Sequence, residues 1–184
     1  MALQLFDAIG PRIGLSATDR QILADAALLH DVGYHINYDK HHKHSYHLIV
    51  HADMLGMTPE EQVAIANVAR YHRGAPPKRK HPNFGMLDRG LRRRIRKLAA
   101  ILRVADGLDR GHIAAVERVK VRWLDRALRI TAVANKRAQS LRLDLWGASR
   151  KSVLLAKVAR VPVEIVAPDG SVIRTQDAEE QSAD

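Results

Sequence analysis

The sequence contains no cysteine. This absence excludes disulfide bonds, thiolate catalysis and cysteine-ligated zinc or iron–sulfur sites, and it is compatible with a reducing compartment. No apolar run approaches the length of about 18 residues that a membrane helix needs, and no signal segment is recognisable at the start of the sequence. We therefore expect a cytoplasmic protein with no membrane partner.

Aromatic residues are also scarce, at 4% of the chain, so we expect a core of leucine, valine, isoleucine and alanine. Acidic residues are outnumbered, because 30 lysines and arginines face 20 aspartates and glutamates, which gives a net charge of +10. This excess favours polyanionic partners such as phosphate chains, nucleotides or nucleic acid, although a solvated basic surface explains it equally well. The sequence has no glycine-rich phosphate loop and no internal repeat.

Histidine, in contrast, is concentrated in one stretch. Seven of the ten histidines lie between His30 and His51. The pair His30-Asp31 follows an apolar helical run at residues 24–29, so both side chains can point at one ion from the end of a helix. Neutral imidazoles and carboxylates are the ligands of borderline divalent metals. A His-Asp pair alone is more often a polar cap, and a metal site is favoured here by the residues that accompany it.

Two of the accompanying residues lie on apolar helix faces. His72 lies on the core-facing stripe of the helix that precedes it, and Asp106 follows Leu102 by four residues and faces inward on a later helix. A buried carboxylate is costly unless it is paired or bound to a cation. With a further histidine at the start of another helix, the sequence predicts one metal site formed by His30, Asp31, His44, His72 and Asp106.

The first 112 residues are typical of helices joined by polar segments. We expect capping boxes at Thr18–Gln21 and Thr58–Glu61, and Asp88 as the cap of a long helix. A basic loop is expected at residues 73–87, either as a mobile flap beside the site or as a solvated connector. Residues 35–43 are expected to form a polar connection, and the helices are predicted over residues 2–9, about 19–31, 45–55, 59–72 and 89–108.

Residues 113–175 differ in character and are predicted to form an α+β appendage. Residues 116–124 and 127–134 alternate and are rich in β-branched side chains, which predicts a hairpin. The acidic end, residues 176–184, is expected to be disordered. Between these parts we expect a third strand over 141–145, a helix over 148–160, a strand over 161–166, a turn at 168–171 and a short strand over 172–174.

Three stretches, LLHDVGYHINYDKHHKHSYHLI, ARYHRGAPPKRKH and RKLAAILRVADGLDR, resemble the HD superfamily of metal-dependent phosphohydrolases. More narrowly, they are similar to the C-terminal HD module of the exopolyphosphatase / guanosine pentaphosphate phosphohydrolase family, over about residues 2–167. The resemblance implies a mainly α fold, with an HD-domain helical bundle over residues 1–112 and a small appended C-terminal α+β piece. It also implies one or two divalent metal ions, with the five residues predicted above as their ligands.

The sequence departs from the family pattern in two ways. HD proteins usually take one ligand from a histidine upstream of the HD pair, and no histidine precedes His30. The N-terminal helix is therefore expected to be truncated, and one ion is expected to lack a ligand. The family's exopolyphosphatase chemistry is attributed to an upstream actin-like phosphatase region, which this sequence does not contain and which we expect to be a separate partner.

The resemblance implies a phosphohydrolase acting on phosphoester or phosphoanhydride bonds, with polyphosphate or a guanosine polyphosphate nucleotide as its phosphate-rich substrate. The expected nucleophile is a metal-bound water molecule, and no separate catalytic residue is assigned. Manganese, iron, cobalt, nickel or zinc suits the predicted ligands, and magnesium suits them less well. The alternative is a non-catalytic module that binds polyphosphate or another polyanion and mediates dimerisation of a larger phosphatase, as a homodimer. The groups expected to neutralise a phosphoryl group are Arg73, Lys43, Lys40 and Arg110.

Overall fold

The computed structural model describes residues 1–174, which form two compact units. The helical unit consists of Leu15–Leu102, and the sheet unit consists of Met1–Gly14 together with the chain from Arg103 onward. The fold is mainly α with a small α+β part, as the sequence predicts, and the described residues include one four-stranded sheet. Within residues 1–174, no helix combines the length and the apolar character needed to cross a membrane.

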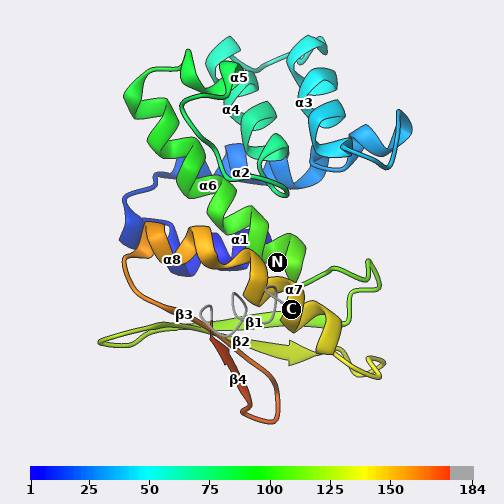
Figure 1. The fold of residues 1–184 in the computed structure, drawn as a ribbon, viewed down its shortest axis with the longest axis vertical. Helices are drawn as coiled ribbons and strands as arrows, with labels where there is room; N and C mark the ends of the chain where they lie inside the picture. Colours follow the sequence, from blue (N-terminus) through cyan, green and yellow to red (C-terminus); the bar gives the residue numbers. More distant parts are fainter. Residues whose placement is uncertain (175–184) are drawn as a thin grey trace. The chain divides into compact units, whose positions relative to one another are not determined.

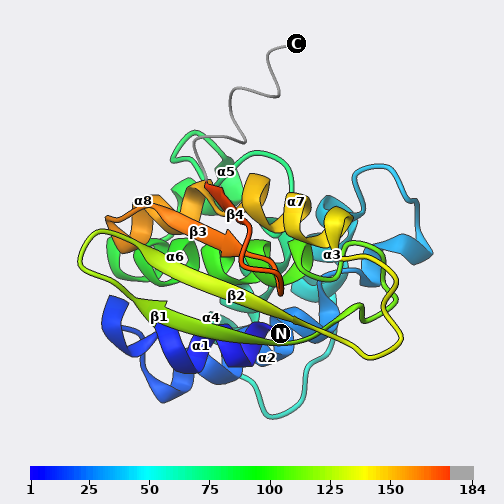
Figure 2. The same cartoon turned by 90° about the horizontal axis from the view of Figure 1, so that it is seen from below.

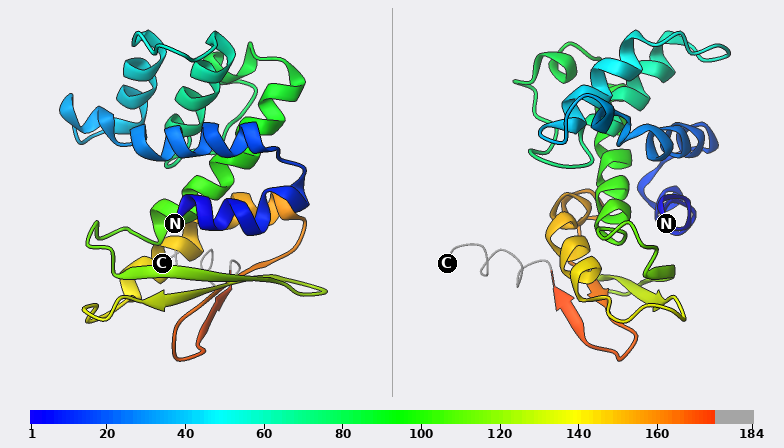
Figure 3. Two further views of the ribbon diagram at one scale, coloured as in Figure 1. Left: turned by 180° about the vertical axis from the view of Figure 1, so that it is seen from behind. Right: turned by 90° about the vertical axis from the view of Figure 1, so that its right-hand side faces the viewer.

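In the helical unit, α3 and α4 stand side by side and α2 runs across one end of the pair (Figure 1, Figure 3). The ends of α2 and α4 therefore lie beside the first turn of α3, which is where the candidate site forms. The elements of this unit are α2 (Ala17–Leu29), the 3-10 turn η2 (Val32–His35), α3 (His41–His51), α4 (Pro59–Arg70), the short α5 (Pro82–Gly85) and the larger part of α6 (Arg89–Gly107).

The cap of α2 differs from the prediction. Ser16, and not Thr18, is the N-cap: its Oγ accepts a hydrogen bond from Asp19 N at 3.3 Å, and Asp19 Oδ2 accepts one from Ser16 N at 2.8 Å. The capping box predicted at Thr18–Gln21 is therefore wrong. The physical reason is tertiary, because Asp19 Oδ1 also accepts a hydrogen bond from Arg94 Nε at 2.8 Å, which fixes this carboxylate in the first turn of the helix.

Two other predicted caps are confirmed. Thr58 Oγ1 accepts a hydrogen bond from Glu61 N at 3.3 Å, with Pro59 in the first turn of α4. Asp88 Oδ1 accepts hydrogen bonds from the first backbone N–H groups of α6, at 2.6 and 3.0 Å. The apolar face of this helix is buried, at Leu91, Ile95, Leu98, Leu102 and Ala105.

Helix α3 begins four residues before the predicted start at Ser45 and ends at His51, before the predicted end at Leu55. Its buried positions are His41, Ser45 and Ile49, which follow one another at intervals of four residues. Residues 41–43, which were predicted to belong to a polar connection, are therefore helical. Because α3 starts one turn earlier than predicted, His41 is the histidine of its first turn that faces the interior.

The basic segment at residues 73–87 is attached to α4 rather than being only a connector. It contains α5, whose Phe84 is buried. Tyr71 Oη lies 3.0 Å from His81 Nδ1, and Asn83 Nδ2 donates a hydrogen bond to Asn67 Oδ1 at 2.8 Å. These bonds fix the segment on the helix from which it departs.

The sheet unit has the strand order β1-β2-β3-β4 (Figure 2). The predicted hairpin is confirmed: β1 and β2 pair antiparallel, β3 pairs parallel with β2, and β4 pairs antiparallel with β3. The strand predicted from residue 161 begins at Val163, and the predicted last strand and its turn are present. The bounds are β1 (Val116–Trp123), β2 (Leu128–Ala134), β3 (Val163–Val166) and β4 (Val172–Arg174).

The predicted strand over 141–145 is wrong, because these residues enter helix α7 (Arg142–Lys151). Leu141 and Leu145 are buried and lie one helical turn apart, whereas Leu143 is 53% exposed, so the leucine pattern reflects a helix face. The helix predicted over 148–160 is divided, and its second part is α8 (Val153–Ala159). The predicted disordered end, residues 176–184, lies outside the described residues.

The first helix, α1 (Ala2–Ile9), has the predicted bounds, but it belongs to the sheet unit together with the 3-10 turn η1 (Pro11–Ile13). Gln4 Oε1 accepts a hydrogen bond from Val119 N at 3.0 Å, and Trp123 Nε1 donates one to the carbonyl of Ala8 at 3.1 Å. These bonds attach α1 to β1. The division of the chain therefore differs from the predicted boundary at residue 112.

We predict that Asp19→Asn lowers the free energy of unfolding by about 1–2 kcal/mol at pH 7, the range for a lost helix cap. Burial by itself raises the pKa of Asp19, but the hydrogen bonds from Ser16 and the ion pair with Arg94 outweigh it and hold the pKa below its ordinary value. The stabilisation that the ionised Asp19 carboxylate gives the folded protein is therefore complete above pH ~4, the ordinary pKa of an aspartate. It is lost as the pH falls through the lower pKa that Asp19 has in the folded state.

Urea denaturation of wild type and variant at neutral and at acidic pH measures this effect. The difference in the free energy of unfolding between wild type and Asp19→Asn should become smaller as the pH falls. Thr18→Ala is the matched control, because Thr18 is exposed and is not the cap, and it should change stability by less than about 0.5 kcal/mol. A larger loss from Thr18→Ala than from Asp19→Asn would contradict the cap that the structure shows.

Candidate metal centre

Asp31, His41 and His72 bring their ligand atoms within 4.8 Å of one another, and all three belong to the helical unit. Asp31 follows α2, His41 starts α3 and His72 follows α4. The two imidazoles are buried, at 1% exposure, whereas the Asp31 side chain is 24% exposed. The cluster is therefore built from three separate elements and is accessible from the side of Asp31.

The backbone orients each ring of the cluster in the same way. His72 Nδ1 lies 2.7 Å from the carbonyl of Ala69, and His41 Nδ1 lies 3.0 Å from the carbonyl of Tyr38. A carbonyl only accepts hydrogen bonds, so Nδ1 of each ring carries the proton and donates it. The Nε2 atoms of the neutral rings are then left as the atoms that can bind a metal, which is the arrangement that metal-binding histidines usually adopt.

The Nε2 atoms converge on one carboxylate oxygen. His41 Nε2 and His72 Nε2 lie 3.2 Å apart, and Asp31 Oδ1 lies 3.2 Å from the first and 3.6 Å from the second. Asp31 Oδ1 is buried and accepts no hydrogen bond from the described part of the chain. Three electron-rich atoms at these distances repel one another unless a positive charge lies among them. The residues therefore fit a divalent cation with His and Asp ligands.

His30 borders this cluster. Its Nε2 lies 3.3 Å from Asp31 Oδ2, and its ring packs edge-on against that of His72 with 4.8 Å between centroids. Its Nδ1 lies 2.7 Å from the carbonyl of Ala27, so this ring is oriented by the backbone as the other two are. His30 is therefore placed to act as a fourth ligand or to orient Asp31.

A close contact between η2 and α3 holds Asp31 against His41. A Cβ atom at Gly33 would lie 2.2 Å from the carbonyl oxygen of His41 and 2.5 Å from Ser45 N, so only glycine allows this approach. Ser45 Oγ donates a hydrogen bond to the carbonyl of His30 at 2.6 Å and accepts one from Gly33 N at 3.0 Å. The chain after the His-Asp pair is thereby fixed to the first turn of α3.

Positive charge gathers beside the cluster. Arg73 Nη1 lies 3.3 Å from His41 Nδ1, which is farther than the carbonyl that this nitrogen contacts. Burial, followed by the charges of Arg70 and Arg73, lowers the pKa of His42 to about 4, so His42 is neutral at pH 7. An anionic ligand that reaches the cluster would therefore meet cationic side chains.

The predicted site residues are distributed as follows. His30, Asp31 and His72 are brought together, whereas His44 is not in the cluster that the structure forms. Asp106 belongs to the sheet unit, and its carboxylate forms an ion pair with Lys151. The inward carboxylate is thus paired, as its position on an apolar stripe requires, and its predicted role as a metal ligand stays a prediction, as does that of His44.

The predicted phosphate-binding cations also divide between the units. Lys40 and Lys43 are exposed in the helical unit near the start of α3, and Lys40 Nζ lies 3.5 Å from Asp39 Oδ2. Arg110 belongs to the sheet unit, where its guanidinium lies over the Trp146 ring at 5.6 Å from the centroid. Arg73 is the predicted cation that contacts a residue of the cluster.

Sequence reasoning missed His41, because the segment around it was assigned to a polar connection. A signal was present: His41, Ser45 and Ile49 recur every four residues, which is the spacing of one helix face. Extending the helix of residues 45–55 toward its N-terminus by one turn would have placed His41 on the buried side.

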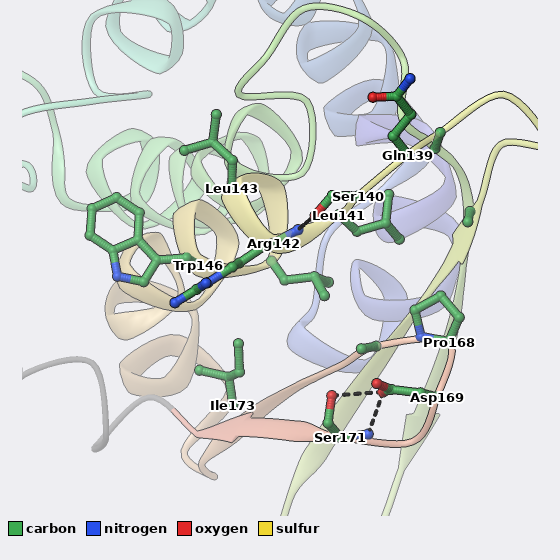
Figure 4. Close-up of a pocket in the computed structure, with 14 residues that line it drawn as sticks. Gln139, Ser140, Leu141, Arg142, Leu143, Trp146, Pro168, Asp169, Ser171 and Ile173 are labelled. Atoms are coloured by element: carbon green, nitrogen blue, oxygen red, sulfur yellow. Dashed lines mark hydrogen bonds between the residues drawn. The ribbon is translucent and has the colours of Figure 1, made fainter.

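A cavity of about 1000 Å³ lies in the sheet unit between α7 and the turn that joins β3 to β4 (Figure 4). Its walls are mostly apolar, with Leu141, Trp146 and Ile173 among them. The carboxylate of Asp169 is already bonded to Ser171, at 2.7 Å from its Oγ and 2.9 Å from its N. The residues that line this cavity therefore offer no set of acid, base and nucleophile.

Residues 1–147 match the family model described as Ppx/GppA phosphatase, domain III. The chain belongs to this family. It is also similar to the guanosine-5'-triphosphate,3'-diphosphate pyrophosphatase of Pseudoalteromonas atlantica, with 34% identity over 74 residues. That alignment covers 40% of this chain and 15% of the relative, so the Ppx/GppA domain III described here corresponds to a small part of that protein.

We predict that Gly33→Ala in this Ppx/GppA domain III lowers the free energy of unfolding by about 1–3 kcal/mol, the range for overpacking. The added methyl group must push η2 away from α3, so the cluster should also lose affinity for metal ions. Urea denaturation and a cobalt(II) titration followed by its absorption measure the two effects. Gly111→Ala is the control, because its Cβ would meet only the Ile113 side chain, at 3.4 Å. Wild-type stability and metal affinity in Gly33→Ala would show that this contact does not position Asp31.

Proposed function

We propose that this domain is an HD-type metal-dependent phosphohydrolase domain, whose ion is held by Asp31, His41 and His72 with His30 beside them. The observation that supports it best is the convergence of two imidazole Nε2 atoms on the buried oxygen of Asp31, which accepts no hydrogen bond from the described residues. Protonation of one imidazole would relieve only part of the repulsion among His41 Nε2, His72 Nε2 and Asp31 Oδ1. A divalent cation placed among the three atoms would relieve all of it.

A divalent metal held by Asp31, His41 and His72 would supply Lewis acidity and would lower the pKa of a water molecule bound to it. The chain itself contributes orientation and charge. The carbonyls of Ala69 and Tyr38 hold the rings, and the hydrogen bonds of Ser45 hold the backbone around Asp31. Arg73 is placed to bind a phosphoryl oxygen, because its guanidinium lies at the edge of the cluster.

We propose phosphoanhydride or phosphoester bonds as the target, in polyphosphate or in guanosine polyphosphates. Membership of the Ppx/GppA phosphatase family supports this substrate class, and so does a relative named as a guanosine-5'-triphosphate,3'-diphosphate pyrophosphatase. The net charge of +10 favours the same anionic substrates. Manganese, iron, cobalt, nickel and zinc are the proposed metals, because the ligands are imidazoles and a carboxylate.

The second candidate is a non-catalytic module that binds a polyanion for a larger phosphatase. One observation favours it: the carboxylate of Asp106, predicted as a metal ligand, is paired with Lys151. Burial lowers the pKa of Lys151 although Asp106 counteracts this, so the two groups form a partly desolvated pair. If Asp106 is not a ligand, the site has one protein ligand fewer and is expected to bind its ion less tightly.

We predict that Asp31→Asn, His41→Gln and His72→Gln each lower the affinity for cobalt(II) or manganese(II) by at least about tenfold. Each change removes one of the atoms that converge at the cluster. Isothermal titration with the metal measures the affinity without relying on activity. His47→Gln is the matched control, since it removes an exposed imidazole from the same helix. We also expect His41→Gln to cost more affinity than His44→Gln, which separates the two candidate ligands of α3.

A phosphatase assay of the metal-loaded wild type with bis(p-nitrophenyl) phosphate, polyphosphate and guanosine pentaphosphate then separates the two functions. Phosphate release that is lost in His72→Gln supports the hydrolase. Tight polyanion binding without phosphate release, in protein that carries its metal, supports the binding module. Equal metal affinity in wild type and all three cluster variants refutes the metal site itself.

We predict that Asp106→Asn lowers metal affinity, as expected of the HD ligand that the resemblance implies. The control is Lys151→Gln, which breaks the same ion pair and leaves the carboxylate in place. Metal titration and urea denaturation of both variants distinguish a ligand from a structural partner. If both variants lose stability to the same extent and keep wild-type metal affinity, Asp106 serves only to pair with Lys151.

A further inference from the structure

Two tyrosines lie exposed beside the histidine cluster. Tyr34 belongs to η2, and Tyr38 belongs to the segment that joins η2 to α3. Their rings stack on each other with 5.4 Å between centroids, and the centroid of the Tyr34 ring lies 4.0 Å from that of His41. We refer to Tyr34 and Tyr38 as the tyrosine pair. The metal centre described above does not use it.

The exposure of these rings increases outward from the metal centre. The side chain of His41 is 1% exposed, that of Tyr34 is 37% exposed and that of Tyr38 is 72% exposed. Ile36, which lies between the two tyrosines in the sequence, is 55% exposed. A single exposed apolar side chain is ordinary, but two stacked rings beside a polar cluster form an aromatic surface that a ligand can cover.

The backbone holds the tyrosine pair through residues of the cluster itself. Tyr34 N donates a hydrogen bond to the carbonyl of Asp31 at 2.9 Å. The carbonyl of Tyr38 accepts one from His41 Nδ1 at 3.0 Å. The backbone of both tyrosines is therefore fixed relative to Asp31 and His41 before a ligand binds, which lowers the entropy lost on binding.

The charges near the cluster distinguish between the ligands that aromatic rings bind. Tyrosine rings stack on other flat rings, and their faces also attract cations. Asp39 is offset by Lys40, whose Nζ lies 3.5 Å from its carboxylate. Arg73 contacts His41, and Lys43 is exposed in the first turn of α3, so a cationic ligand would be repelled. A flat ring joined to an anionic group suits both features, and a nucleotide is such a molecule.

We propose that the tyrosine pair is a nucleobase-binding subsite, so that the site takes a nucleotide in preference to an inorganic phosphate chain. Every base has a π face and stacks on aromatic side chains. The base lies on Tyr38, the more exposed ring, and its phosphoryl group extends toward His41, whose ring centroid is 6.1 Å from that of Tyr38. The inference rests on the proposed function for the place of the phosphoryl group, whereas the stacking itself requires no metal.

Titration of the wild type with AMP and with ribose 5-phosphate, in buffer with a metal chelator, isolates the contribution of the base. The two ligands share the phosphoryl group and the sugar, and only AMP carries a base. We expect AMP to bind at least about fivefold more tightly, the lower end of the range for one stacked base.

Three variants test which ring the base contacts. Tyr38→Leu keeps an apolar side chain but removes the π face, and it should raise the Kd for AMP about fivefold and leave that for ribose 5-phosphate unchanged. Tyr38→Phe keeps the π face and should bind AMP as the wild type does. Trp146→Leu is the matched control and should also bind AMP as the wild type does, because it removes a partly exposed aromatic ring from the sheet unit. Wild-type affinity for AMP in Tyr38→Leu overturns the proposal.

Metal titration of the same variants separates this inference from the proposed function. Tyr38→Leu should keep the wild-type affinity for cobalt(II), because the backbone carbonyl of Tyr38 and not its ring orients His41. Loss of both metal and AMP affinity in Tyr38→Leu assigns the ring a structural role and overturns the subsite.

The two proposals can fail independently. Equal affinities of the wild type for AMP and ribose 5-phosphate overturn the subsite even if the metal cluster is confirmed. Preferential binding of AMP that persists in Asp31→Asn supports the subsite even if the metal site proves absent. Tighter binding of a single-stranded RNA octamer than of AMP, lost in Tyr38→Leu, overturns the proposal in favour of a nucleic-acid ligand.

Discussion

The candidate metal centre depends on one backbone contact, the approach of η2 to the first turn of α3 at Gly33. With no side chain at this position, the carbonyl of His41 and the N–H of Ser45 lie where a Cβ atom would otherwise be. Ser45 then joins the two segments through its hydroxyl group. Asp31 is fixed against His41 by the fold itself, and the end of α4 brings His72 to the same point. Ligands held in this way lose little conformational freedom when an ion binds.

The sequence predicted the long periodic elements well, because many residues contribute to each pattern. The stripe of α6, the hairpin of β1 and β2 and the box at Thr58 are examples. Short patterns were ambiguous. The leucines at 141–145 alternate like a strand, yet Leu141 and Leu145 also share a helix face. Ser16 and Thr18 each precede a polar residue by three positions, and a tertiary partner, Arg94, decides for Ser16.

The site was predictable where its residues follow helices with long periodic patterns. His30, Asp31 and His72 follow helices with clear apolar faces, and the structure brings these three together. His41 was missed, since the start of α3 depends on the left-handed backbone of Lys40, with φ of 56°, which the sequence does not reveal. The need of Asp106 for a cationic partner was evident from its apolar stripe. That Lys151 supplies it was not, because the partner lies 45 residues away.

The segment between α4 and α6 begins at a residue of the histidine cluster and is held against the helix before it. His72 at its start belongs to a group of acceptors that a cation would stabilise. The bonds of Tyr71 and Asn83 and the burial of Phe84 hold this segment in one arrangement. Coupling between two sites requires an element with two arrangements that the ligands distinguish. Because this segment has one, the position of His72 at the cluster is set by the fold and not by an ion.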